Sequence, residues 1–290
     1  MIQKKASYHP DQSFEIQISE VEYRRAGDEA WLARIYQPQG AGTFPVLLDV
    51  HGGAWTRGRL DGNARMNRVL AASGVVVVAI DYRLAPEHPY PAQVADVNYA
   101  TRWIKTHAAE LNADPDFVGA LGASSGGHTV MMSAMRPRDP RYTELSLPDG
   151  READASLAYV LAMWPVLDSH ARYLYARNSG RDRLKESSES YFLTEEAMQE
   201  GNPQMILERG EPVFLPPVLL IQGTDDDNVP QSIPEKFVQS YRGAGGVITL
   251  ELFPRMPHGF GNQDFPESDA ALEIVKKFVK NQLAVSQMVV

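Results

Sequence analysis

The chain begins with two segments in which apolar and polar residues alternate. "FEIQISEVEY" starts at Phe14 and "WLARIYQP" starts at Trp31. A period of two residues is typical of a strand that buries only one of its faces. We therefore expect two half-exposed antiparallel strands at the start of the fold.

Further along, the pattern changes to short runs that are apolar almost throughout. Strands buried on both faces have this pattern, and parallel sheets covered by helices require it. The runs are "FPVLLDV" at 44–50, "VVVVAI" at 75–80, "FVGAL" at 117–121, "ASLAYVLAM" at 155–163 and "PVLLI" at 217–221. "VITLELF" at 247–253 predicts one more strand.

Segments with helical spacing lie between these runs. Residues 92–111 place Val94, Val97, Ala100 and Ile104 three or four positions apart, and residues 268–283 predict a closing helix. Two antiparallel strands followed by repeated strand–helix units predict an α/β fold with a mostly parallel, doubly wound sheet.

One segment, residues 168–214, interrupts the alternation of strands and helices between two core strands. It is much longer than the usual connection of about 4–6 residues, and a loop of this length is commonly a lid or cap. We expect residues 1–290 to form a single domain, with 168–214 as a cap insertion. Alternatively, its tyrosines only pack the segment onto the core, and its charged stretch at 177–190 is a solvated face.

Composition narrows the classes of function. The formal net charge of -9 and the pI near 5.3 disfavour nucleic acid as a partner. No run approaches the ~20 apolar residues of a membrane span, and the first residues contain no signal-peptide core. We expect a cytoplasmic protein. Because the chain contains no cysteine, disulfides and thiolate metal sites are excluded.

"LGASSGGHTV", at 121–130, follows a predicted buried strand and contains two adjacent serines. At a strand-to-helix turn, G-x-S-x-G forms a sharp elbow that exposes the serine oxygen. The positions two before and two after the nucleophile must be small. Around Ser124 they are Gly122 and Gly126, so Ser124 is the candidate nucleophile and Ser125 supplies a backbone N–H. A glycine-rich helix start capped by serine is the alternative.

A serine nucleophile needs an adjacent base. Five of the seven histidines lie in places that favour structural roles: His9, His88, His107, His128 and His170. His258 follows the last predicted strand in "PRMPHGFGN", a loop that lets an imidazole reach the carboxyl edge of the sheet. We therefore predict that His258 is the base.

The remaining histidine, His51, begins "HGGAW" directly after a buried strand. Two glycines let the backbone approach a ligand closely and leave N–H groups free for an oxyanion. We predict that Gly53, Ala54 and Ser125 donate these N–H groups. A tight turn without such a role is the alternative.

Taken together, "HGGAW", "DYRLAPEHPYPA", "GASSGG", "GTDDDNVP" and "HGF" resemble the α/β-hydrolase fold, specifically the hormone-sensitive-lipase-like carboxylesterases. That resemblance implies Ser124 as nucleophile and His258 as base. Similar hydrolases show a G-x-x-D-x-x-V-P spacing, which implies Asp226 as the acid. Ala123 and Ala54 stand where that branch usually has an acidic residue and a third glycine. "HGG-x-W" is also similar to arylformamidases and to some feruloyl or acetyl-xylan esterases.

These observations predict a serine hydrolase that cleaves short-chain or small aryl carboxylic esters through an acyl-enzyme, with no cofactor and no metal. An arylformamidase or amidase of the same fold and a catalytically inactive binding protein are the alternatives. A metal enzyme that uses "DDD" is disfavoured, because hard cations need several converging oxygens. We expect a small-molecule ester as partner, and the sequence leaves a homodimer open.

Overall fold

The computed structural model describes residues 5–288, and within them eight strands form one sheet in the order β1-β2-β4-β3-β5-β6-β7-β8. All neighbours from β4 to β8 are parallel, whereas β1 pairs with β2 and β2 with β4 in antiparallel fashion. The strands are β1 Ile16–Ala26, β2 Glu29–Pro38, β3 Phe44–Val50, β4 Val76–Ile80, β5 Ala113–Ala123, β6 Tyr159–Met163, β7 Val218–Gly223 and β8 Ile248–Phe253. The predicted α/β sheet with antiparallel first strands is confirmed.

Helices cover both faces of the sheet, which explains why the central strands are apolar throughout. On one face, Leu47 and Val77 pack with α1 (Ala64–Ala72) and α9 (Pro266–Met288). On the other, Leu48 and Val78 pack with α2 (Ala92–Thr106), α3 (Ser125–Met135) and α8 (Ser232–Gly243). Short 3-10 helices span Pro148–Gly150 and Phe260–Asn262.

Several predicted boundaries were wrong by a few residues. The strand expected over 117–121 spans Ala113–Ala123, and the closing helix expected over 268–283 spans Pro266–Met288. The helix expected over 92–111 ends at Thr106, after which the chain turns and reaches a left-handed φ of 49° at Asn112. The strand expected over 155–163 begins at Tyr159, where its ladder with Gly119 of β5 starts. Of the apolar residues before that ladder, Ala155 is buried, and Leu157 and Ala158 are half-buried.

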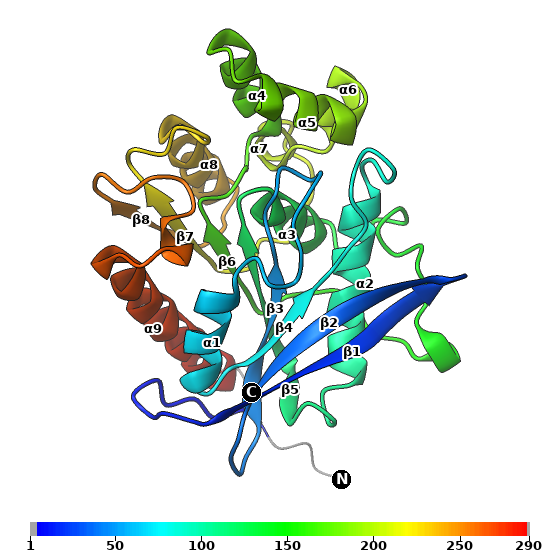
Figure 1. The fold of residues 1–290 in the computed structure, drawn as a ribbon, viewed down its shortest axis with the longest axis vertical. Helices are drawn as coiled ribbons and strands as arrows, with labels where there is room; N and C mark the ends of the chain where they lie inside the picture. The colour runs from blue at the N-terminus through cyan, green and yellow to red at the C-terminus, as the bar shows by residue number, and fades with distance from the viewer. Residues whose placement is uncertain (1–4, 289–290) are drawn as a thin grey trace.

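The segment 168–214 connects β6 to β7 and forms α4 (Ser169–Asn178), α5 (Asp182–Phe192), α6 (Glu195–Glu200) and α7 (Pro203–Glu208). Asp168, Thr194 and Asn202 cap three of these helices by accepting backbone N–H bonds. Its aromatic residues Tyr191 and Phe192 are buried against Trp55, which follows β3. Figure 1 shows α4, α5 and α6 at one end of the molecule, beyond the sheet.

Within residues 5–288, no helix combines the length and the apolarity needed to cross a membrane.

Candidate active site

The predicted site residues come from the ends of parallel strands. Ser124 directly follows β5, Gly53 follows β3, Asp226 follows β7 and His258 follows β8. Because the carboxyl ends of parallel strands lie at the same edge of a sheet, segments distant in sequence meet there. Gly53, Ser124 and His258 line one pocket together with Arg172 of the 168–214 segment, and Asp226 bonds to His258.

Ser124, His258 and Asp226 form a single chain of hydrogen bonds. The Ser124 hydroxyl lies 2.9 Å from Nε2 of His258 and donates to it. On the other side of the ring, Nδ1 of His258 donates to Oδ2 of Asp226 over 2.7 Å. In this arrangement the imidazole can accept the serine proton while a buried carboxylate holds its tautomer.

Ser124 occupies a sharp bend between β5 and α3. Its φ of 55° and ψ of -119° lie in a region that non-glycine residues rarely adopt. A Cβ atom on Gly122 would lie 2.5 Å from the carbonyl oxygen of Gly126, and one on Gly126 would lie 2.2 Å from that of Val50. The two small positions therefore flank Ser124, as the sequence register requires.

Asp226 is held by four hydrogen bonds in the loop after β7. Its Oδ1 accepts the backbone N–H groups of Asn228 and Val229 at 2.9 and 2.8 Å. Its Oδ2 accepts the side-chain amide of Gln222 at 2.9 Å in addition to His258. The neighbouring Asp225 and Asp227 are exposed, and Asp227 pairs with Arg181 at 3.0 Å. Of the three consecutive aspartates, only Asp226 faces the histidine.

The loop after β3 contains two of the backbone N–H groups that are predicted from the sequence to bind an oxyanion. Among the described residues, the N–H groups of Gly53, Ala54 and Ser125 have no hydrogen-bond acceptor. Gly53 has a φ of 128°, and a Cβ there would lie 1.9 Å from the carbonyl oxygen of Arg57. Ala54 and Trp55 also have positive φ values, of 50° and 62°. The Ser125 hydroxyl accepts the Trp55 N–H at 3.3 Å, so it helps to hold this loop.

His128 connects the nucleophile helix to its surroundings. Its Nδ1 accepts the indole N–H of Trp55 at 3.2 Å, and its Nε2 donates to the Gly201 carbonyl at 2.7 Å. Burial lowers the pKa of His128 to about 4, against a smaller raising effect from Gly201. The imidazole is therefore neutral at pH 7, and its local packing role agrees with the sequence interpretation.

The site opens into a pocket of about 240 Å³ that contains Ser124 and His258. Five of the other side chains around it are polar or cationic, namely Arg57, Asn63, Arg172, Asn228 and Asn262, and Trp164 adds an aromatic surface. Sequence reasoning found none of these six. The helical spacing of 169–178 gives no sign that Arg172 is buried. By contrast, Gln222 is a polar residue within the apolar segment "PVLLIQG", and this pattern could have indicated its role beside Asp226.

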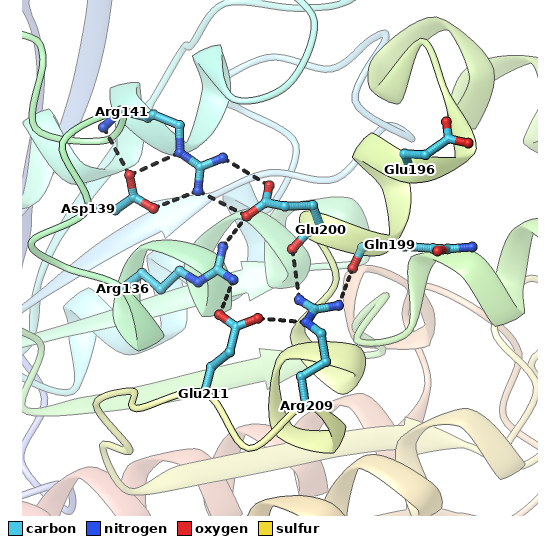
Figure 2. Close-up of a pocket in the computed structure, with 8 residues that line it drawn as sticks. All are labelled: Arg136, Asp139, Arg141, Glu196, Gln199, Glu200, Arg209 and Glu211. Atoms are coloured by element: carbon cyan, nitrogen blue, oxygen red, sulfur yellow. Dashed lines mark hydrogen bonds and ion pairs between the residues drawn. The ribbon is translucent and has the colours of Figure 1, made fainter.

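A larger hollow, of about 570 Å³, lies where α6 meets the end of α3. We call it the charged hollow; it is lined by Arg136, Asp139, Arg141, Glu196, Gln199, Glu200, Arg209 and Glu211. Figure 2 shows its three guanidinium groups turned toward carboxylates, with Glu200 at the centre of the ion pairs. The described residues that line it include neither a serine nor a histidine, and each of its three arginines pairs with a carboxylate.

A metal centre would need several ligands close together. Over residues 5–288, no group of three or more His, Asp or Glu side chains is placed to hold an ion. The consecutive aspartates of the acid loop point in different directions, which is why they do not form such a group.

The strand order, the elbow after β5 and the histidine loop after β8 define an α/β-hydrolase fold with a serine–histidine–carboxylate site. Residues 34–240 match the BD-FAE family model. The chain belongs to the BD-FAE family, and the predicted resemblance to α/β-hydrolase-fold esterases is confirmed.

Curated relatives and solved structures agree with this assignment. The chain is 30% identical to the probable carboxylic ester hydrolase LipM of Mycobacterium tuberculosis over 76% of this chain and 50% of the relative. It is 32% identical to the esterase LipC of the same organism over 74% and 53%. The chain thus spans about half the length of these relatives.

Among solved structures, the fold is shared with esterase B of Lactobacillus Rhamnosis, at a TM-score of 0.80 and 21% identity, over 98% of this chain and 90% of that one. It is also shared with a thermophilic esterase of Thermogutta terrifontis, at a TM-score of 0.70 and 24% identity, over 92% and 93%.

Proposed function

We propose that this protein hydrolyses carboxylic esters of small molecules through a covalent acyl-enzyme on Ser124. The observation that carries the proposal is the hydrogen-bonded chain from Ser124 through His258 to Asp226. The relatives named as ester hydrolases support the same reaction class.

In the first half of the reaction, Oγ of Ser124 attacks the ester carbonyl carbon while its proton passes to Nε2 of His258. Asp226 stabilises the imidazolium that forms. The carbonyl oxygen, now negative, accepts the N–H groups of Gly53, Ala54 and Ser125. When the tetrahedral intermediate collapses, the carbon–oxygen bond to the alcohol breaks and the alcohol leaves with the proton from His258.

In the second half, water takes the place of the alcohol. His258 removes a proton from that water, the resulting oxygen attacks the acyl carbon, and the bond to Ser124 breaks. Ser124 recovers its proton from His258, and the carboxylic acid is released. No group outside the chain is needed for this proton balance.

We further propose that the 168–214 segment acts as a cap on a single domain and limits the size of the substrate. Drug-sized ligands occupy pockets of roughly 300–1,000 Å³, and this pocket, at about 240 Å³, is smaller. Acetyl or butyryl esters should therefore be hydrolysed faster than long-chain esters in a p-nitrophenyl ester series. Faster turnover of dodecanoate than of acetate would contradict a size-limiting cap.

The proposal is tested by changing the two adjacent serines separately. Ser124→Ala removes the attacking oxygen and should reduce kcat for p-nitrophenyl acetate by roughly a millionfold. Ser125→Ala keeps the backbone N–H and loses only the hydroxyl bond to Trp55, so much of the activity should remain. Equal losses in both variants would refute the elbow register, and turnover of N-formylkynurenine but not of esters would assign an amidase instead.

We predict a cytoplasmic location and no nucleic-acid partner. A homodimer stays open.

A further inference from the structure

Arg172 of α4 is a buried cation in the wall of the candidate active site. Its side chain is 1% exposed, and it borders the same pocket as Ser124 and His258. Nε and Nη2 both donate to Oδ1 of Asn228, at 3.2 and 2.7 Å, and the guanidinium carbon lies 5.7 Å from the centre of the Trp55 ring. Nη1 is buried without a hydrogen-bond partner in the described part of the chain.

No carboxylate in the described part of the chain pairs with this guanidinium. Among residues 5–288, Arg172 takes part in no ion pair with an Asp or Glu side chain. Asp226 attracts it at longer range, but both Asp226 oxygens are already occupied by His258, Gln222 and two backbone N–H groups. Burial lowers the pKa of Arg172 to about 10, so the group is still charged at pH 7.

The charge of the pocket differs from that of the chain. Overall, 37 acidic residues outnumber 28 basic ones. The described residues that line the pocket nevertheless include Arg57 and Arg172 and no Asp or Glu. Arg57 lies near enough to repel Arg172, and it too has no ion-pair partner among the described residues. Two cations thus face a pocket whose walls contain no anion.

Keeping a cation buried without a counter-charge is unfavourable, because the guanidinium loses its hydration and gains no ionic partner. A substrate that carried an anion would supply the missing partner and would also accept a hydrogen bond from Nη1. Building on the proposed ester hydrolysis, we propose that the physiological substrate is an ester that carries a carboxylate, which binds between Arg172 and Arg57.

Matched substrates test this without dependence on chain length. 4-Acetoxybenzoate and 4-acetoxybenzamide differ only in the charge on the alcohol side, and monomethyl terephthalate and methyl 4-carbamoylbenzoate differ in the same way on the acyl side. All four are rigid, so the carboxylate cannot attack its own ester. In at least one pair, the wild type should hydrolyse the carboxylate substrate with a kcat/KM about 10- to 100-fold higher than that of the amide substrate. One charge-assisted hydrogen bond produces a preference of this size. No preference in either pair would overturn the proposal.

Variants assign the preference to Arg172. Arg172→Met should abolish the preference, measured as the ratio of the two kcat/KM values within a pair, and Arg172→Lys should restore part of that ratio. Arg177→Met is the matched control, because Arg177 belongs to the same helix but is exposed and pairs with Glu195 outside the pocket. If Arg172→Met slowed both members of the pair equally, Arg172 would only support the acid loop through Asn228, and the proposal would fail.

A binding measurement separates this proposal from the proposed reaction. The Ser124→Ala variant should bind the carboxylate of the preferred pair more tightly than the amide by calorimetry. Arg57→Gln, a change at an exposed residue, should weaken that preference to a smaller extent than Arg172→Met. Selective binding without any hydrolysis by the wild type would refute the reaction but keep the anion site. Equal hydrolysis and equal binding of both partners would refute the anion site alone.

Discussion

The charged hollow and the pocket of the candidate active site both lie against the 168–214 segment, and both contain arginine side chains. In the charged hollow, Arg136 and Arg141 pair with Glu200, and Arg209 pairs with Glu211. In the site pocket, Arg172 is more deeply buried and donates only to the neutral side chain of Asn228. Among the described residues, every arginine of the larger hollow therefore has an anionic partner, and Arg172 of the smaller one has none.

The difference indicates that arginine side chains have two roles in this protein. Ion pairs between partly exposed groups fasten one element to another and contribute modestly to stability. A buried cation without an anion stabilises nothing by itself, and such groups are concentrated at sites where a ligand completes them. We therefore expect changes in the site pocket to affect turnover, and changes in the charged hollow to affect the free energy of unfolding.

The largest effect is expected from Asp226→Asn. The asparagine keeps the size of the side chain but cannot hold the His258 tautomer or stabilise an imidazolium, so kcat should fall by roughly three to four orders of magnitude. Steady-state kinetics with p-nitrophenyl acetate measure the change.

Asp227→Asn is the control for that experiment. Asp227 is the next residue in the chain, is exposed and pairs with Arg181. Loss of the Asp227 charge should reduce kcat by about tenfold or less, because it should change the stability of the loop by only around 1 kcal/mol. If Asp227→Asn abolished activity and Asp226→Asn had only a mild effect, Asp227 would be the acid of the site. The assignment of Asp226 would then be wrong.

The sequence could predict the reacting groups better than their surroundings. Ser124 lies between Gly122 and Gly126 directly after an apolar run, and His258 precedes Gly259 in the loop after another run, so local patterns mark both candidate residues. The burial of Arg172 depends on Trp55 and on Asn228, which is 56 positions away, so no local pattern encodes it. The same holds for the hydrogen bond of His128 to Gly201, 73 positions away.

His128 lies between the two regions, because it bonds Trp55 near the site pocket and Gly201 next to the charged hollow. Its pKa is lowered from 6.5 to about 4, so between these values the unfolded chain binds the proton more readily than the native protein. The stability that neutral His128 contributes is full above pH 6.5 and is lost as the pH falls toward 4. The shift corresponds to roughly 3 kcal/mol at most.

His128→Gln tests this, since glutamine retains one donor and one acceptor but cannot be protonated. Urea unfolding at pH 8 and pH 5 should show that the wild type loses about 2 kcal/mol more than the variant on acidification. Burial raises the pKa of Asp49 to about 6, which acts in the opposite direction but is common to both proteins. The exposed His9→Gln serves as a control, and a variant with the same pH slope as the wild type would contradict the prediction.

The smallest effect is expected in the charged hollow, from Glu200→Gln. Burial alone would raise the pKa of Glu200, but hydrogen bonds from Arg141, Tyr90 and Arg136 lower it to about 2. A carboxylate with a lowered pKa contributes stability above its unfolded value, here 4.5, and loses it as the pH falls toward 2.

Because the Glu200 side chain is 39% exposed, solvent screens these ion pairs, and the variant should lose only on the order of 1 kcal/mol of unfolding free energy at pH 7. That loss should shrink below pH 4.5 and in high salt, while kcat for esters changes by about twofold or less. Glu196→Gln is the matched control, since Glu196 belongs to the same helix but is exposed and lies apart from the ion pairs (Figure 2). A large fall in kcat with unchanged stability would mean that the charged hollow acts in turnover, and the division between the two regions would not hold.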